Sequence, residues 1–182
     1  EILAALVYDR AFTSGYTGGD GIVLGSASHK NIAGGTYSNI LATAADLSEA
    51  ALEQAVTDLM KLKNDRSLNV AVLPQSLIVP VDLWAEAEKI MKTVTEVGTA
   101  NNTVNVVRSR FPKGVKVNHY LTDTDAWFIR TNVRDGMKYF VRREDTFDMD
   151  DDFDTDNAKY KATFRCAFGW TDPRGFFGTA GA

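Results

Sequence analysis

A run of strict alternation near the C-terminus places the strongest limit on how this chain can fold. Between residues 158 and 170, apolar side chains occupy every second position: Tyr160, Ala162, Phe164, Cys166, Phe168 and Trp170. Because successive side chains of a β-strand point to opposite faces, the pattern predicts a single strand with one buried face. About eleven residues at about 3.3 Å each span roughly 36 Å, which is long for a compact domain and favours an elongated molecule.

An acidic run precedes this strand and separates it from another strand predicted at 137–142. Within residues 145–156, aspartates recur at alternate positions: Asp148, Asp150, Asp152, Asp154 and Asp156. We interpret the run as a loop that is either solvated or forms salt bridges with a neighbouring subunit. The same alternation is compatible with one charged face of a strand, opposite Met149 and Phe153.

Two chemical uses of the acidic run remain as alternatives. A calcium loop of the helix–loop–helix kind needs glycine at its sixth position and glutamate at its twelfth, but counting from Asp152 these positions hold Asn157 and Thr163. We therefore assign no metal site, and a calcium-stabilised binding module is kept only as an alternative. A small carboxylate-based hydrolase is the other alternative, because paired acids about 5 to 9 Å apart would serve in hydrolysis.

Helical periodicity is clearest in the middle of the chain. Ser48 suits an N-cap, Leu47 and Leu52 are placed for a hydrophobic staple, and the pattern predicts a helix over 48–62. A second helix is predicted from Asp82 onward, with Trp84 on its apolar face. The first 12 residues are typical of a helix end, and the glycine-rich stretch that follows is predicted to be irregular and to need a partner. Further strands are predicted at 68–73, 77–81, 104–108, 115–121 and 126–131, with a polar turn at 99–103.

Composition argues against catalysis, membrane insertion and an extensive nucleic-acid surface. The 182 residues carry a net charge of −4, no window reaches the ~20 apolar residues of a membrane span, and no secretory leader is visible. His29 and His119 lie near no Gly-x-Ser-x-Gly or zinc-ligand pattern, so we interpret both as structural and assign no catalytic residue and no cofactor. The lone Cys166 is interpreted as a small buried hydrophobe. Because the chain lacks an initiating methionine, we expect further sequence upstream.

Many short segments occur in the order found in one family of structural proteins. They are 20–24, 28–29, 47–48, 70–74, 77–80, 83–84, 101–102, 104–107, 125–127, 152–154, 169–170 and 174–175, together with Asn39, Tyr160 and Arg165. As an ordered set they resemble the major capsid protein of tailed bacteriophages with the Hong Kong 97-type fold, and in particular the major head subunit of Mu-like phages.

The resemblance implies an α+β subunit with two regions. An axial domain, a central sheet flanked by helices, would comprise residues 46–135 and the returning tail, 171–182. An elongated peripheral domain would comprise residues 1–45, with the end of a spine helix, and the long strands of 136–170. A full subunit of this family also has an N-terminal arm, an extended loop and a longer spine helix.

The function that the resemblance implies is structural and not enzymatic. Such subunits assemble as homo-oligomers, pentamers and hexamers, into an icosahedral shell that encloses double-stranded DNA without sequence-specific binding. Scaffolding, portal and decoration proteins would be further partners, and no membrane is involved. The protein would be assembled in the cytoplasm of the host bacterium and reside in the virion.

Charged side chains of the last third are our candidates for subunit contacts. We expect Asp150, Asp152 and Asp154 of the acidic run to supply register together with Arg142 and Arg143.

Aromatic side chains near the C-terminus are further candidates, with two interpretations left open. Trp170, Phe176 and Phe177 either pack near a subunit contact or fill the core of the axial domain.

Overall fold

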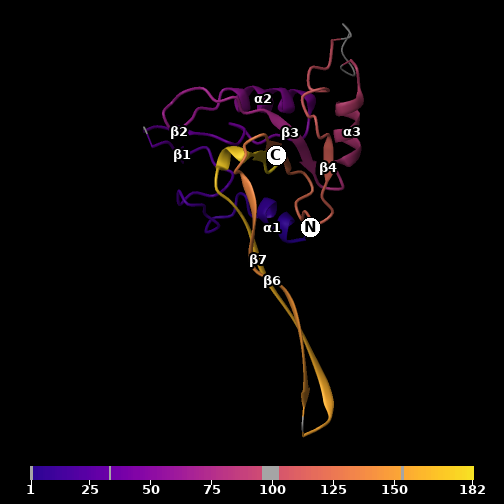
Figure 1. Cartoon of the computed structure of the whole chain (residues 1–182). Helices are drawn as coiled ribbons and strands as arrows, with labels where there is room; N and C mark the ends of the chain where they lie inside the picture. Colours follow the sequence, from indigo (N-terminus) through magenta and orange to yellow (C-terminus); the bar gives the residue numbers. More distant parts are fainter. Residues whose placement is uncertain (1, 33, 96–102, 153) are drawn as a thin grey trace.

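The computed structural model describes residues 2–32, 34–95, 103–152 and 154–182. Figure 1 shows a body of helices and short strands from which one long, twisted two-stranded ribbon projects. The elements are, in order, α1 (Ile2–Asp9), β1 (His29–Lys30), β2 (Thr36–Tyr37), α2 (Glu49–Met60), β3 (Pro74–Val79), α3 (Trp84–Lys92), β4 (Val115–Val117), β5 (Trp127–Thr131), β6 (Met137–Asp152), β7 (Asn157–Trp170), the 3₁₀ turn η1 (Pro173–Gly175) and β8 (Phe176–Thr179).

A four-stranded mixed sheet lies at the centre of the body, in the order β4-β3-β5-β8. The pair β3–β4 is parallel, whereas β5 runs antiparallel to both of its neighbours. The strand β8 comes from the C-terminal tail and pairs with β5 through Ile129 and Phe177. The tail therefore returns to the body after the projecting ribbon and completes the sheet.

Each face of this sheet carries its own hydrophobic core. Trp127 and Ile129 of β5 lie in one cluster with the buried face of α2, while Phe128 lies in the other cluster with Val7 of α1. The alternation continues in β8, where Phe177 joins the first core and Phe176 the second. Because side chains alternate across a strand, two adjacent phenylalanines can anchor two different layers. The result is a helix, sheet, helix arrangement with β5 in the middle.

The helix predicted over 48–62 is confirmed as α2, and its start follows from the sequence. The Ser48 side chain accepts a hydrogen bond from the Ala51 amide at 3.2 Å, as an N-cap does. Leu47, Leu52 and Leu59 are all buried against the sheet. The first helix is likewise confirmed as α1.

The prediction for α3 is wrong in two details. The helix begins at Trp84 with Leu83 as its cap, so Asp82 lies outside it. Trp84 is 53% exposed and Ala87 is the buried residue that joins the core. An apolar side chain in the first turn of a helix has few neighbours on the helix itself, so its spacing says little about burial.

The predicted strands of the body are confirmed in part. Strand 126–131 is found as β5, 115–121 shortens to β4, and 77–81 begins earlier, at Pro74. The strands predicted at 68–73 and 104–108 are wrong, since each contributes only an isolated bridge, Lys63–Asn69 and Thr95–Val104. Most of the polar turn at 99–103 lies outside the described residues. The division of the chain at residues 45, 135 and 170 stays a prediction.

The C-terminal ribbon corrects two expectations. Most of the acidic run is strand and not loop, because β6 extends through Asp152 and pairs with β7 along its whole length. The face of β7 that the sequence predicts to be buried is covered only in part: Phe168 and Trp170 pack against the second core, whereas Tyr160 is 78% and Phe164 63% exposed. Cys166 on the same face is half-buried. The alternating pattern therefore reports an apolar face, but this chain alone covers only part of it.

The contrast between body and ribbon can be measured by unfolding. Replacing the fully buried Phe177 by alanine leaves a cavity between α2 and the sheet, and we expect it to lower the free energy of unfolding by about 3 to 5 kcal/mol. Phe147→Ala in the ribbon is the matched control, because that ring is 82% exposed and its loss should change the value by less than about 0.5 kcal/mol. Urea titration measures both, and equal losses would contradict the assignment of the core.

Candidate functional site

The β6–β7 hairpin presents a continuous apolar face. Side chains of cross-strand partners share a face, and one such series consists of Met137/Trp170, Tyr139/Phe168, Val141/Cys166, Phe147/Ala162 and Met149/Tyr160. The Tyr139 and Phe168 rings confirm the pairing, with centroids 4.8 Å apart. We call this series, together with Phe164, the apolar stripe. Its base packs against the second core through Met137, Phe168 and Trp170, and its outer part is exposed, which is typical of an interaction surface.

The opposite face of the hairpin carries Phe140 and Ala167 near the body and is polar farther out, where charges lie opposite each other. Asp148 faces Lys161 and Asp150 faces Lys159 across the strands. Lys159 also binds the carboxylate of Asp152 at 2.6 Å, and this hydrogen bond lowers the pKa of Asp152. Cross-strand charge pairs of this kind each add a few tenths of a kcal/mol up to about 1 kcal/mol to a hairpin. They let an aspartate-rich segment adopt the extended conformation that aspartate otherwise disfavours.

Two irregularities interrupt the hairpin near its middle. The register shifts between Val141 and Arg143, and again between Arg143 and Thr146. Extra residues on β6 bend the strand and increase its right-handed twist, which Figure 1 shows as the crossing of the two strands. The hairpin regains regular pairing beyond this point, where the Thr146 and Thr163 hydroxyls lie 2.7 Å apart.

The charged residues predicted as contacts therefore fall into two groups. Asp152 binds Lys159 inside the chain, a partner that the sequence did not single out, and Asp150 lies opposite the same lysine without an ion pair to it among the described residues. Arg142 and Arg143 form no ion pair with any part of the chain that the structure describes, and the Asp154 carboxylate likewise has no cation there. Their role in subunit contacts stays a prediction.

The aromatic candidates lie mostly inside the molecule. Phe176 and Phe177 are buried in the two cores, which is the second of the interpretations left open by the sequence. Trp170 lies at the base of the hairpin, half-buried, next to Gly18 of the N-terminal loop. Neither phenylalanine offers surface to a neighbour in the isolated chain.

Two glycines hold the base of the hairpin to the body. Gly136 precedes β6 and Gly175 precedes β8, and a Cβ added to Gly136 would lie 2.6 Å from the Gly175 Cα atom. The backbones can approach this closely because neither residue has a side chain. Hydrogen bonds from the Thr171 amide to the Gly136 carbonyl, 3.0 Å, and from the Thr131 hydroxyl to the Arg174 carbonyl, 2.8 Å, fix the same junction.

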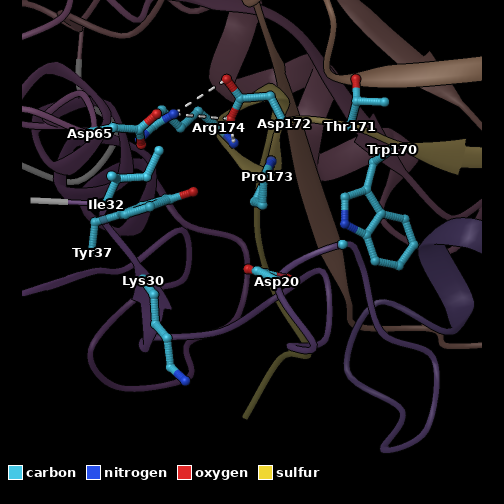
Figure 2. Close-up of a pocket in the computed structure, with 11 residues that line it drawn as sticks. Asp20, Lys30, Ile32, Tyr37, Asp65, Trp170, Thr171, Asp172, Pro173 and Arg174 are labelled. Atoms are coloured by element: carbon cyan, nitrogen blue, oxygen red, sulfur yellow. Dashed lines mark hydrogen bonds and ion pairs between the residues drawn. The ribbon is translucent and has the colours of Figure 1, made fainter. Parts of the chain in front are cut away.

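Arg174 joins the hairpin base to two other segments. Its guanidinium binds Asp65 beyond α2 at 2.6 Å and Asp172 at 3.4 Å, and it lies 4.6 Å above the ring centroid of Tyr37. Figure 2 shows these groups around a pocket of about 310 Å³ that Asp20 and Trp170 also line. The charge of Arg174 is thus neutralised by its own neighbours, and we interpret the pocket as a structural joint.

A buried histidine bound to a partly exposed aspartate stabilises the loop beside this pocket. His29 is fully buried, with Nδ1 2.7 Å from the Asp20 carboxylate and Nε2 3.0 Å from the Leu24 carbonyl. Partial burial on its own would raise the pKa of Asp20, but the hydrogen bonds from His29 and the Ile22 amide outweigh it and lower the pKa. This agrees with the structural interpretation of His29. No periodic pattern in the sequence marks the contact, because its members come from a loop without regular structure.

The geometry does not assemble a site of the hydrolase or calcium type in the part of the chain that is described. The alternating acids lie along an exposed ribbon opposite lysines, and no group of three or more His, Cys, Asp or Glu side chains that could hold a metal ion occurs among the described residues. None of the described helices is long and apolar enough to cross a membrane. The prominent exposed apolar surface among the described residues is the outer part of the hairpin.

The comparison with protein families identifies the class. The model of the phage capsid protein family matches residues 1–178, so this chain belongs to that family. It is a capsid subunit, a structural component of the virion. A search among curated proteins finds no match.

Two solved structures are similar over part of their length. One is a virus-like particle from Pyrococcus furiosus, with 16% sequence identity. The structural alignment covers 78% of this chain and 55% of the other, at a TM-score of 0.41. The other is a structure from Mycobacterium phage Che8, with 15% sequence identity. The alignment covers 79% of this chain and 54% of the other, at a TM-score of 0.43. This chain therefore spans about half the length of either protein.

The glycine contact at the hairpin base gives a sharp test. Gly136→Ala forces two backbone segments apart, and we expect it to lower the free energy of unfolding by about 1 to 3 kcal/mol. Gly19→Ala is the control, because a Cβ there meets nothing within 4 Å, and its effect should stay within about 0.5 kcal/mol. Urea unfolding distinguishes the two, and an unchanged Gly136 variant would mean that the junction is not closely packed.

Tyr37 provides a test of the Arg174 joint by pH. Burial raises the pKa of Tyr37 from 10.0 to about 12, with Arg174 acting in the opposite direction. Because the folded phenol holds its proton more tightly than the unfolded one, this stability is complete below pH 10 and is lost as the pH rises towards 12. Unfolding free energies across this range should fall more steeply for the natural chain than for Tyr37→Phe. Parallel curves would show that Tyr37 is not buried as described.

Proposed function

We propose that this chain is the shell-forming part of the major capsid protein of a tailed double-stranded DNA phage, similar to the Mu-like major head subunit and with the Hong Kong 97-type fold. In this proposal it assembles as pentamers and hexamers into an icosahedral shell. Membership of the phage capsid family supports the structural role. The single observation that carries the proposed assembly is the apolar stripe of the hairpin.

The stripe needs a partner for energetic reasons. An isolated two-stranded ribbon is marginally stable in water, and three or more strands or a packed layer are normally required. Phe147, Tyr160 and Phe164 are each more than half exposed, so burying them is worth about 25 cal/mol for each Å² of apolar surface removed from water. In a shell made of many copies of one chain, a neighbouring copy supplies the cover at every position.

The charge of the chain suits the enclosure of DNA without specific recognition. The net charge is −4, whereas proteins that grip nucleic acid present a strongly basic surface. Scaffolding, portal and decoration proteins are proposed as further partners, and assembly is proposed to take place in the host cytoplasm. No metal or cofactor has a role in this proposal.

Particle formation by the full-length protein tests the proposal directly. Sedimentation and negative-stain imaging should show megadalton shells, or pentamers and hexamers that convert into them. Stable monomers or dimers under all salt and crowding conditions would contradict the proposal. The calcium-module alternative predicts that a chelator lowers the melting temperature, which we do not expect.

Substitutions in the apolar stripe separate assembly from folding. Tyr160→Ser with Phe164→Ser should abolish or strongly reduce particle formation, because the surface buried between copies is lost. The melting temperature of the unassembled chain should change little, since both side chains are exposed. Thr163→Ser with Ala167→Ser on the opposite face of the same strand is the control and should assemble normally. If the variant with Tyr160→Ser and Phe164→Ser forms normal particles, the apolar stripe is not part of the contact between copies.

A further inference from the structure

The hairpin is electrically divided along its length. The half next to the body, residues 137–143 and 164–170, which we call the stem, carries Lys138, Arg142, Arg143 and Arg165 and no acid, a net charge of +4. The outer half, residues 144–163, which we call the tip, carries eight acidic residues against two lysines, a net charge of −6. Figure 1 shows that the tip is the part of the ribbon farthest from the body.

The stem contains a charge arrangement that is unfavourable in a single chain. Arg143 and Arg165 are direct cross-strand partners, and like charges placed opposite each other destabilise a hairpin. Both are exposed, and neither forms an ion pair within the described parts of the chain. Two guanidinium groups side by side form a good receptor for carboxylates, which they bind through two parallel hydrogen bonds each.

The tip contains matching acids that its own lysines do not neutralise. Asp148, Asp150 and Asp152 are opposite or bound to Lys161 and Lys159. Asp151 and Asp154 are exposed and have no cation among the described residues. Part of the uncompensated charge of the tip therefore lies at the end of the ribbon, where it can meet another molecule, whereas Glu144 and Asp145 lie next to the stem.

We propose that the tip of one hairpin lies on the stem of a hairpin from a second copy of this chain, with Asp151 and Asp154 neutralising the Arg143–Arg165 pair. This inference rests on the proposed function and identifies the contact that sets the register between neighbouring copies. Every copy carries one tip and one stem, so the contact can repeat around a closed assembly, and each contact offsets the +4 of a stem against the −6 of a tip. A second copy fits better than DNA, because the tip would be repelled by phosphates and only the stem would be attracted.

A charge exchange within one chain tests the contact. Reversing the stem, Arg143→Glu with Arg165→Glu, or the tip, Asp151→Lys with Asp154→Lys, should weaken association between copies of the full-length protein by about tenfold or more, equivalent to about 1.4 kcal/mol. Combining both reversals restores opposite charges between copies and should return association to nearly its original strength. Association is measured by analytical ultracentrifugation, and particles are imaged in parallel. Raising the salt from about 0.1 to 1 M shortens the Debye length from ~10 to ~3 Å and should reduce the differences between variants.

A control and the contrary outcomes keep the inference separate from the proposed function. Arg108→Glu with Arg110→Glu makes the same charge change on the body and should not be rescued by the reversed tip. If it is rescued, the receptor is the body and not the stem.

If stem reversal reduces only the DNA content of shells, the arginines bind nucleic acid. Single reversals without effect also overturn the inference, although shells would still support the capsid role. If association is lost in the single reversals and restored in the combined variant, but no shells form, the contact is supported and the shell-forming role is rejected.

Discussion

The pairing of β5 with β8 is the constraint on which the rest of the structure depends. β5 separates the two cores, and β8 adds one phenylalanine to each of them. Because β6 and β7 lie between these two strands in the sequence, the pairing forces the intervening chain to leave the body and return at one point. The contact between Gly136 and Gly175 marks that point. A long hairpin held at its base is the geometrical consequence.

Body and hairpin consequently obey different energetics. The body buries its large side chains between helices and sheet and is stable by its own packing. The hairpin is a two-stranded sheet that packs against the second core only at its base, through Met137, Phe168 and Trp170, so the outer part of its apolar stripe is left to solvent. In the proposed assembly, the body is the support that displays the hairpin to a neighbouring copy.

The sequence predicted those elements whose signals are local. The Ser48 cap, the spacing of Leu52 and Leu59 and the apolar run of β5 depend on the chain within one turn or one strand, and α2 and β5 are found as expected. It failed where the partner decides the conformation. Residues 145–152 are predicted first as a loop, with a charged strand face as the alternative, and the alternative is found, with Lys159 and Lys161 opposite the acids. Likewise, the alternation in β7 correctly predicts an apolar face, but Tyr160 and Phe164 on that face are exposed and not buried. The sequence did not predict the joint at Arg174, because two of its partners, Asp65 and Tyr37, are distant in sequence and follow no period.

The hairpin carries charged side chains on one face and the apolar stripe on the other, and this combination has a consequence for the proposed assembly. Exposed ion pairs are each worth about 0 to 1 kcal/mol and are sensitive to salt, whereas burial of apolar area is less specific but larger. A contact that uses charge for register and apolar area for affinity can form, dissociate and form again until every copy is correctly placed, because no single pair is strong enough to trap an error. Many such contacts together still give a durable shell. An uncharged stripe alone would lack register, and charges alone would lack affinity, so the coexistence of both on one ribbon favours reversible, directed self-association over a permanent pairwise contact.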